Sequence, residues 1–190
     1  MTCYEALLPA VRIGRSLHHH HQAAWRMFAC GRENLEDRNF VFSLREIGLR
    51  QYLHLRSSEP FPGSVERRTQ VPAGQSMTIR IKLHPIRTST ESEPNTGAKV
   101  KHRRLVPSDQ RNQWATEMLE RRGMTVSSIS LLAEQSWPWG KRGYEHISTL
   151  VSEFQANITV VDPDLFQQAW VQGIGKRKGY GLGMMVEVKP

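Results

Sequence analysis

The sequence has very little cysteine and no long apolar run. Cys3 and Cys30 are its only cysteines, too few for a disulfide framework or a four-ligand zinc site. No secretory signal peptide begins the chain, and no apolar stretch approaches the length of a transmembrane helix. We therefore expect a cytoplasmic protein with reduced thiols and no membrane partner.

The familiar nucleotide-binding motifs are also missing. A P-loop needs Ser or Thr after its Gly-Lys pair, but Arg177 follows Lys176, and Trp170 stands where the first glycine would be. A dinucleotide-binding fingerprint needs an acidic residue about 20 positions further on, and the chain ends soon after Gly183. No cluster of Asp and Glu indicates a metal-dependent nuclease. We expect neither a cofactor nor a metal site.

Positive charge, by contrast, is in excess. The chain has 26 Lys and Arg against 18 Asp and Glu, a formal net charge of +8. That value is at the upper end of what solubility requires of a small domain. A polyanionic partner is the natural explanation, and nucleic acid is the leading candidate.

The segment from Gly173 to Gly183 concentrates glycine and cationic side chains. Glycine lets backbone N–H groups approach a polyanion closely, and lysine and arginine pair with phosphates. Glycine and lysine alone are also typical of a mobile linker. The apolar run Met184–Val188 predicts a closing strand and favours an ordered loop. We predict that this loop binds nucleic acid through Gly173, Gly175, Lys176, Arg177, Lys178, Gly179 and Gly181.

Four consecutive histidines, His18 to His21, fall in a predicted helix that Ser16 would cap. Adjacent histidines fan around a helix, and no carboxylate or cysteine completes a metal site with them. The predicted apolar stripe has helical spacing and includes His21. Its members are Leu17, His21, Ala24, Trp25 and Phe28.

His21 is therefore predicted to point toward the body of the protein. A histidine in such a place is usually a satisfied core group, but it is also the side chain best suited to proton transfer near neutral pH. His18 lies one turn earlier and can share its face. Two imidazoles at a phosphodiester could act as base and acid, and RNA supplies its own nucleophile, the 2′-hydroxyl.

The order of predicted elements indicates an α+β fold. Strand, helix, strand, strand and a weakly marked helix are followed by strand, helix, strand, strand, helix and strand, which we interpret as βαββαβ twice. We predict two tandem ferredoxin-like (RRM-like) domains, at 1–75 with the histidine helix and 76–190 with the glycine-rich loop. The predicted strands cover 4–13, 39–46, 50–56, 77–86 and 125–134, with two further strand pieces within 147–161, and the helices cover 16–28, 107–122 and 162–174.

Several connections carry their own expectations. Residues 57–74 are predicted to hold a short helix or the bridge between halves, 88–98 a flexible loop, and 137–143 a turn. Thr78, Arg80, Lys82 and His84 are predicted to form an exposed basic face of one strand. Ser108 and Asp162 are predicted helix caps, Gly31 and Gly123 are predicted helix ends, and Gly48 is a predicted turn. Trp137 and Trp139 could stack on bases or fill a core, and the core is the default expectation.

Four segments carry a resemblance to a known family. From His21, the run His-Gln-Ala-Ala-Trp-Arg-Met-Phe is similar to L-H-Q-x-L-W-x-L-F, and residues 31–42 look like the segment that follows it. Ile79–Thr88 resembles R-x-x-x-N-P-I-K-T, and Gln172–Gly183 resembles Q-G-I-G-x-x-K-x-x-G-x-G. These are segments of the CasE family, the CRISPR repeat-processing endoribonucleases of the type I-E (Cascade) system.

The resemblance implies metal-independent cleavage of precursor CRISPR RNA at the 3′ base of the repeat hairpin, leaving a 2′,3′-cyclic phosphate. The family's catalytic histidine falls on His21. Its tyrosine, three or four residues earlier, falls on His18 or Leu17, so either His18 replaces it or activity is altered. The family's basic segment would grip the RNA stem through phosphates and groove edges. It falls on Lys99, Lys101, Arg103 and Arg104.

The resemblance also implies the partners, which are CRISPR repeat RNA, as precursor and as mature crRNA, and the other Cascade subunits. Outside that complex we expect a monomer. Two other functions use the same surfaces. A non-catalytic RNA-hairpin-binding subunit would bind without cutting, and a metal-dependent nuclease would stop cutting in EDTA.

Overall fold

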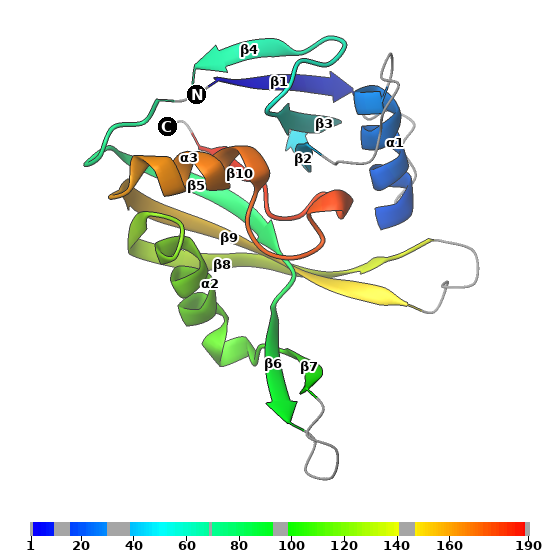
Figure 1. Ribbon diagram of the computed structural model, residues 1–190. Helices are drawn as coiled ribbons and strands as arrows, with labels where there is room; N and C mark the ends of the chain where they lie inside the picture. The colour runs from blue at the N-terminus through cyan, green and yellow to red at the C-terminus, as the bar shows by residue number, and fades with distance from the viewer. Residues whose placement is uncertain are drawn as a thin grey trace.

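Two four-stranded antiparallel sheets and a long two-stranded hairpin make up the protein, as a computed structural model shows (Figure 1). The structure describes residues 2–9, 16–29, 39–68, 70–92, 99–140 and 147–188. The predicted helix end at Gly31 and positions 141–143 of the predicted turn lie outside these residues.

The first sheet has the strand order β2-β3-β1-β4. Its strands are β1 (Thr2–Pro9), β2 (Phe40–Ile47), β3 (Arg50–Ser57) and β4 (Val65–Arg68). Helix α1 (Leu17–Ala29) covers one face, where Ala24 and Phe28 pack against Phe40, Phe42 and Leu55. Gly48, at φ 61°, turns the β2–β3 hairpin, as the sequence predicted.

The short helix that was one expectation for residues 57–74 does not form among the residues of this segment that the structure describes. The chain instead forms the short edge strand β4, which pairs antiparallel with β1. All four residues of β4 are exposed, so this segment has no apolar stripe that a helix could bury. The first half is therefore βαβββ.

The second sheet has the order β10-β5-β9-β8. Its strands are β5 (Ser76–Leu83), β8 (Met124–Pro138), β9 (Ser148–Val160) and β10 (Met185–Glu187). Helices α2 (Arg111–Glu120) and α3 (Pro163–Gln172) cover the face built from Ile79, Ile81 and Phe154. When the four strands of each sheet are renumbered 1 to 4 along the chain, both sheets follow the order 4-1-3-2. The two ferredoxin-like domains are therefore confirmed. The boundary at residues 75 and 76 stays a prediction.

Of the helix boundaries predicted in the second half, those at Asp162 and Gly123 are confirmed and the cap at Ser108 is wrong. Asp162 caps α3, because its Oδ1 accepts the N–H groups of Asp164 and Leu165 at 3.1 and 3.0 Å. Gly123, at φ 77°, ends the helical segment before β8. Ser108 is not a helix cap, because it opens the short 3₁₀ turn η1 (Ser108–Gln110) and no side chain caps α2.

Three strand predictions need correction. β8 continues through Trp137 and Pro138, which were predicted to form a turn, and β9 is one continuous strand rather than two. Pairing of β8 with β9 along their whole length supplies the backbone hydrogen bonds that keep both strands extended. His84 is buried, not exposed, and its Nδ1 donates to the carbonyl of Leu150 at 2.8 Å.

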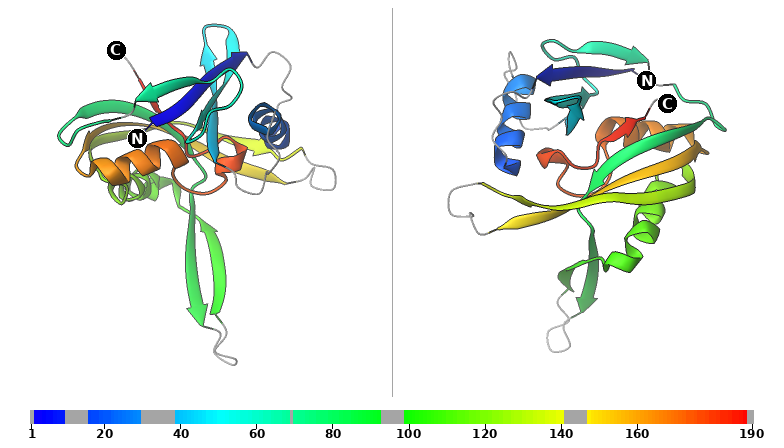
Figure 2. Two further views of the ribbon diagram at one scale, coloured as in Figure 1. Left: turned by 45° about the horizontal axis from the view of Figure 1, so that its top comes forward. Right: turned by 180° about the vertical axis from the view of Figure 1, so that it is seen from behind.

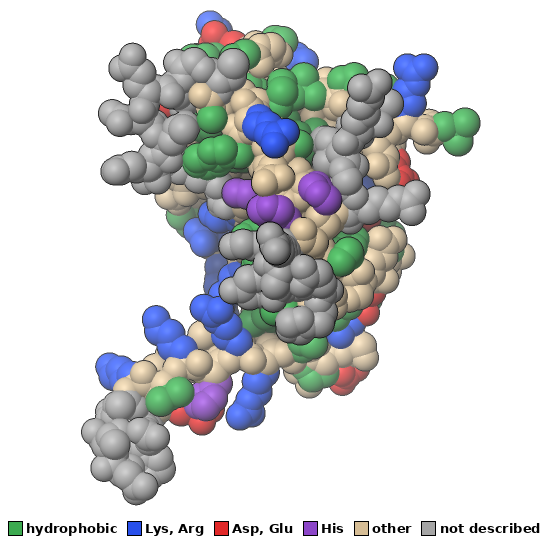
Figure 3. Space-filling model, turned by 90° about the vertical axis from the view of Figure 1, so that its right-hand side faces the viewer, with side chains coloured by type: hydrophobic (Ala, Val, Ile, Leu, Met, Phe, Trp, Pro, Cys, Tyr) green, Lys and Arg blue, Asp and Glu red, His purple; other side chains and the backbone are tan. Residues whose placement is uncertain are grey.

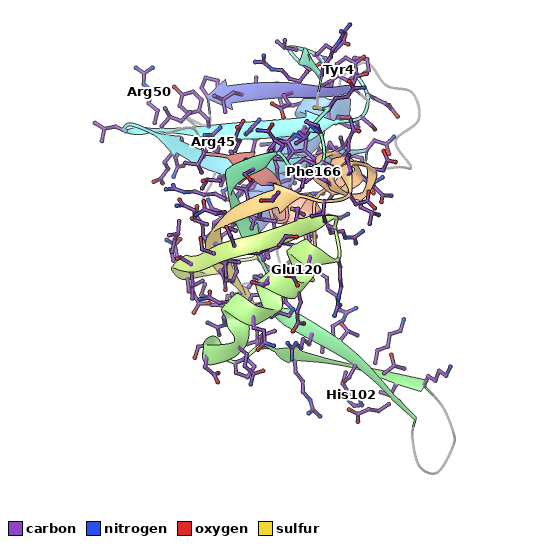
Figure 4. The ribbon with its side chains drawn as sticks, turned by 90° about the vertical axis from the view of Figure 1, so that its left-hand side faces the viewer. Tyr4, Arg45, Arg50, His102, Glu120 and Phe166 are labelled. Atoms are coloured by element: carbon purple, nitrogen blue, oxygen red, sulfur yellow. The ribbon has the colours of Figure 1, made fainter. Side chains whose placement is uncertain are left out.

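The long hairpin is formed by β6 (Ile86–Ser92) and β7 (Lys99–Leu105). Residues 88–92, expected in a flexible loop, belong to β6, and residues 93–98 lie outside the described chain. The hairpin projects away from both sheets (Figures 1 and 2). Figure 4 shows His102 on it, at the opposite end of the molecule from Arg50 at the start of β3. No helix among the described residues is long and apolar enough to cross a membrane.

Arg56 of β3 joins the two halves. Its side chain is 1% exposed, its Nε donates to Glu5 Oε1 at 2.5 Å, and its Nη1 donates to the carbonyls of Trp170 and Met185 at 2.8 and 3.0 Å. The guanidinium also lies 4.1 Å from the centre of the Trp170 ring. Because Trp170 belongs to α3 and Met185 to β10, this side chain ties β3 of the first half to two elements of the second.

Acid should weaken this contact. Burial raises the pKa of Glu5, but the hydrogen bond from His54 and the charge and hydrogen bond of Arg56 outweigh it and bring the pKa to about 2, against an ordinary 4.5. A carboxyl with a depressed pKa stabilises the fold above the unfolded value and loses that contribution as pH falls toward the folded value. We expect the free energy of unfolding to fall from about pH 4.5 toward pH 2, measured by urea titration at each pH.

Glu5→Gln is the matched control, because it keeps the shape of the side chain but cannot titrate. The variant should be less stable at neutral pH, with a shallower decline in stability below pH 4.5. If the acid-induced declines of the two proteins coincide, Glu5 does not contribute to the pH dependence.

Candidate functional site

Helix α1 presents its four histidines in different directions. The buried residues of the helix are Leu17, His20, Ala24 and Phe28, so His20, not His21, lies on the fully buried stripe. The His20 ring meets the Trp137 ring edge-on at 5.8 Å. Ser16 caps the helix, since its Oγ accepts the N–H of His19 at 3.3 Å. His21 is half-buried at the border of this stripe, which leaves part of its ring accessible.

The glycine-rich loop meets α1 at His21. The loop is ordered, with a 3₁₀ turn η2 (Lys178–Tyr180) and the closing strand β10 after it. The Nδ1 atom of His21 lies 2.6 Å from the carbonyl oxygen of Gly179. A carbonyl can only accept a hydrogen bond, so Nδ1 carries the proton and the neutral ring keeps its lone pair on Nε2. Figure 2 shows this loop running beside α1.

His18 lies one turn before His21 and is half-buried. Its backbone N–H donates to the carbonyl of Trp139 at 3.0 Å, and its ring lies 6.5 Å from the ring of His19. Residues three apart on a helix are neighbours on one face. The two histidines predicted from the sequence are therefore adjacent on α1, next to the end of β8.

Tyr180 is a site residue that the sequence analysis did not single out. Its ring lies 5.1 Å from the ring of His21 and 5.0 Å from the ring of Trp139. The signal was present in the sequence, because Tyr180 is the only aromatic residue between Gly173 and Gly183. Trp139 is half-buried and forms part of the site rather than the core that was predicted.

The cations of the loop connect the histidine helix to the hairpin. The Lys176 ammonium donates to Thr88 Oγ1 of β6. Arg177 has φ 60°, a left-handed conformation, and its guanidinium lies 4.8 Å from the centre of the Trp139 ring. Burial lowers the pKa of Arg177, the Tyr180 phenol acts against this, and Arg103 of β7 lowers it further.

His84 shares this positive field. Burial lowers the pKa of His84, the Leu150 carbonyl raises it, and Arg177 and Lys176 lower it. The side chains of Lys176, Arg177 and Arg103 therefore bring positive charge to the loop and the hairpin close to His84. Such a region favours an anion.

The predicted stem-binding residues all lie on β7. Lys99, Lys101, Arg103 and Arg104 are exposed. Because side chains alternate along a strand, Lys99, Lys101 and Arg103 share one face of the hairpin and Arg104 lies on the other. Arg87 of β6 anchors the base of the hairpin to α2 through Glu117, with 3.7 Å between Nη2 and Oε2.

Positively charged side chains extend from the hairpin toward the histidines. In Figure 3 a group of histidine side chains lies in the middle of one face, and lysine and arginine side chains continue from there along the hairpin. A rod-shaped polyanion could follow this line while one of its linkages reaches α1.

The glycines of the loop have packing roles. A Cβ on Gly181 would lie 2.9 Å from the Phe42 ring, and one on Gly183 would overlap the carbonyl of Ile174. Both residues also have positive φ. Gly179 is buried and uses its carbonyl for His21, while Gly173 and Gly175 sit where the loop leaves α3. Contact of these glycines with RNA stays a prediction.

A metal site is not formed by the described side chains, which bring together no group of three or more His, Cys, Asp or Glu suited to a metal ion. What the arrangement offers is a histidine with one oriented nitrogen, a second histidine beside it, and cations nearby. These are the parts for proton transfer at a phosphate.

Comparison with known proteins identifies relatives by family and by fold. The family described as CRISPR associated protein matches residues 7–190. Among curated proteins, no sequence matches this chain.

Solved structures are similar over the whole chain. One is the CRISPR endoribonuclease Cse3 bound to a 19-nucleotide RNA, with a TM-score of 0.72, 15% identity and coverage of 99% of each chain. Another is the CRISPR-associated protein Cas6e from Escherichia coli, with a TM-score of 0.71, 18% identity and full coverage of both chains. A chain of a CRISPR RNA-guided surveillance complex matches with a TM-score of 0.62 and 18% identity over both full lengths. At these identities the likeness establishes a shared fold.

Proposed function

Because this chain belongs to the CRISPR-associated protein family, we propose that it is an endoribonuclease that cuts precursor CRISPR RNA at the base of the repeat hairpin. The observation that carries the proposal is the hydrogen bond between His21 Nδ1 and Gly179, which places the histidine helix against the cationic loop. The similar Cse3 structures with bound RNA support it.

In the proposed reaction His21 is the general base. Its Nδ1–H is held by Gly179, so Nε2 is free to take the proton of the 2′-hydroxyl. The 2′-oxygen then attacks the adjacent phosphorus, and the bond from phosphorus to the 5′-oxygen breaks. His18, as an imidazolium, gives the leaving 5′-oxygen its proton. The products are a 2′,3′-cyclic phosphate and a 5′-hydroxyl.

Positive charge would hold the RNA during this step. Lys176, Arg177 and Lys178 belong to the loop that contacts His21 through Gly179, and they would bind phosphates at the cleavage point, where charge develops on the phosphoryl oxygens. Lys99, Lys101, Arg103 and Arg104 would bind the stem along the hairpin. No metal ion is needed for any step.

After cleavage the protein would keep the mature crRNA and join the other Cascade subunits in antiviral defence, in the cytoplasm. The match to a chain of an RNA-guided surveillance complex supports this part of the proposal. Outside the complex we propose a monomer.

Incubation with a hairpin repeat RNA in EDTA tests the activity. We expect a cut at the 3′ base of the stem, a cyclic phosphate on the upstream fragment, and no cut when the nucleotide before that bond carries 2′-deoxyribose. A mobility shift without any product would mean that the chain is a binding subunit only. Cutting that EDTA abolishes would mean a metal-dependent nuclease.

The charges of the hairpin should set affinity rather than the rate of the bond-breaking step. Each lost phosphate contact reduces the salt dependence of binding by about one counterion. We therefore expect Lys101→Ala and Arg103→Ala each to weaken RNA binding and to lower the slope of log Kd against log salt by about 0.7–0.9. Filter binding at several salt concentrations measures this. Arg68→Ala, on exposed β4 at the opposite end of the molecule from the hairpin, is the matched control and should leave the slope unchanged (Figure 1).

A further inference from the structure

A continuous row of rings passes through His21. The Trp25 and His21 rings are stacked, with centroids 6.1 Å apart and 27° between their planes, and His21 is followed by Tyr180 at 5.1 Å and 33°. Tyr180 is followed by Trp139 at 5.0 Å and 48°. We call these four side chains the aromatic column. They come from α1, from the glycine-rich loop and from the end of β8, so folding alone assembles the column.

The outer end of the aromatic column is held in place. Trp139 Nε1 donates to Thr149 Oγ1 at 2.9 Å, and its carbonyl accepts the N–H of His18 at 3.0 Å. The Arg177 guanidinium covers the Trp139 ring at 4.8 Å. These contacts hold the Trp139 ring in place, so it provides a fixed surface against which the Tyr180 ring packs.

We propose that Tyr180 is a positioning residue for His21, an inference that rests on the proposed function of His21 as the base. The hydrogen bond to Gly179 fixes the position of Nδ1. Rotation of the imidazole about the Cβ–Cγ bond is otherwise only weakly restricted, because this torsion has broad energy minima. The rings of Tyr180 and Trp25, which both contact the imidazole, restrict that rotation. Nε2 is thereby aimed at one position, where the 2′-hydroxyl is bound.

The ring of Tyr180, rather than its hydroxyl, carries this role. Aromatic pairs attract at centroid separations of 4.5–7 Å, and both neighbours of Tyr180 fall in this range through their rings. Phenylalanine would keep both contacts, whereas leucine would fill part of the space without an aromatic face. The two substitutions therefore separate the ring from the hydroxyl.

Single-turnover cleavage of the hairpin RNA by saturating enzyme tests the inference. Misplacement of a reacting group by about 1 Å can cost on the order of 100-fold in rate, so we expect Tyr180→Leu to cleave about 10- to 100-fold more slowly. Tyr180→Phe should cleave within about threefold of the wild type, and the Kd for RNA should stay within about threefold for both. The ring-current shift of the His21 Cε1–H signal should be kept in Tyr180→Phe and reduced in Tyr180→Leu.

The outcomes distinguish this inference from the proposed function. If the wild type does not cleave, the proposed function fails, while the His21 signal still reports whether Tyr180 orients the ring. If the wild type cleaves and Tyr180→Leu cleaves equally fast, the positioning role is wrong. Slow cleavage by Tyr180→Phe would mean that the hydroxyl, not the ring, is required. Equal losses of binding and cleavage in Tyr180→Leu would mean that Tyr180 only maintains the structure of the loop. Either result overturns the inference.

Discussion

Replacing His21 by alanine is expected to slow cleavage of the repeat hairpin by about 10²–10⁴-fold and to leave RNA affinity unchanged. A positioned proton-transfer group typically contributes that much to a rate. The imidazole is half-buried on α1 and contacts the loop through Nδ1 and its ring, whereas the charges proposed to bind phosphates belong to other side chains. Because the product is expected to stay bound, the rate constant of a single turnover is the quantity to measure, together with Kd for uncut RNA.

His19→Ala is the matched control for this experiment. His19 is the neighbouring histidine on the same helix, is exposed, and bonds only locally to Ser16 at 2.9 Å. It should cleave at close to the wild-type rate. Normal cleavage by His21→Ala would refute the assignment of the base, and loss of RNA binding by that variant would show that His21 serves the structure of the binding surface instead.

Replacing Arg56 by alanine is expected to lower the free energy of unfolding by about 3–5 kcal/mol, the usual cost of removing one partner from a buried ion pair. The Glu5 carboxylate would lose its cation, and the carbonyls of Trp170 and Met185 would lose their donor. Unpaired buried polar groups keep the full cost of leaving water. Urea denaturation followed by circular dichroism measures the loss.

The variant should also cleave more slowly than its folded fraction predicts. His21 belongs to the first half and Gly179 to the second, and Arg56 is one of the contacts that hold these halves in register. Arg50→Ala, at the exposed start of the same strand, is the control and should change stability by no more than about 0.5 kcal/mol. A loss below about 1 kcal/mol in Arg56→Ala would mean that the halves are held together without this ion pair.

Much of the fold could be predicted because its signals are local. The Asp162-Pro163 start of α3, the helix after Ser16 and the alternation along β5 each depend on residues a few positions apart. Where such signals were weak, the prediction failed. Residues 65–68 form an edge strand because β1 supplies their backbone hydrogen-bond partners. The pattern of residues within a short segment does not show which strand will lie beside it.

The sequence identified the two segments of the candidate site but not the aromatic side chains around His21. His21 and the glycine-rich loop were both identified, and the structure brings them together across 158 positions of sequence. The buried stripe of α1 was predicted to include His21, but the buried histidine is His20. The four adjacent histidines look alike in sequence, and only the contact of His20 with Trp137 shows that it is the interior one. The roles of the predicted site residues in RNA cleavage stay proposals.

The sequence by itself determined the family, the plan of two α+β domains, the basic character of the chain and the two segments that meet at the candidate site. These follow from composition, periodicity and motifs, which are properties of neighbouring residues. Only the tertiary structure decided which nitrogen of His21 is free, that the Tyr180 ring contacts the His21 ring, and that Arg56 ties the halves together. Each of these depends on contacts between distant segments, whose geometry is set by how two sheets and their helices pack.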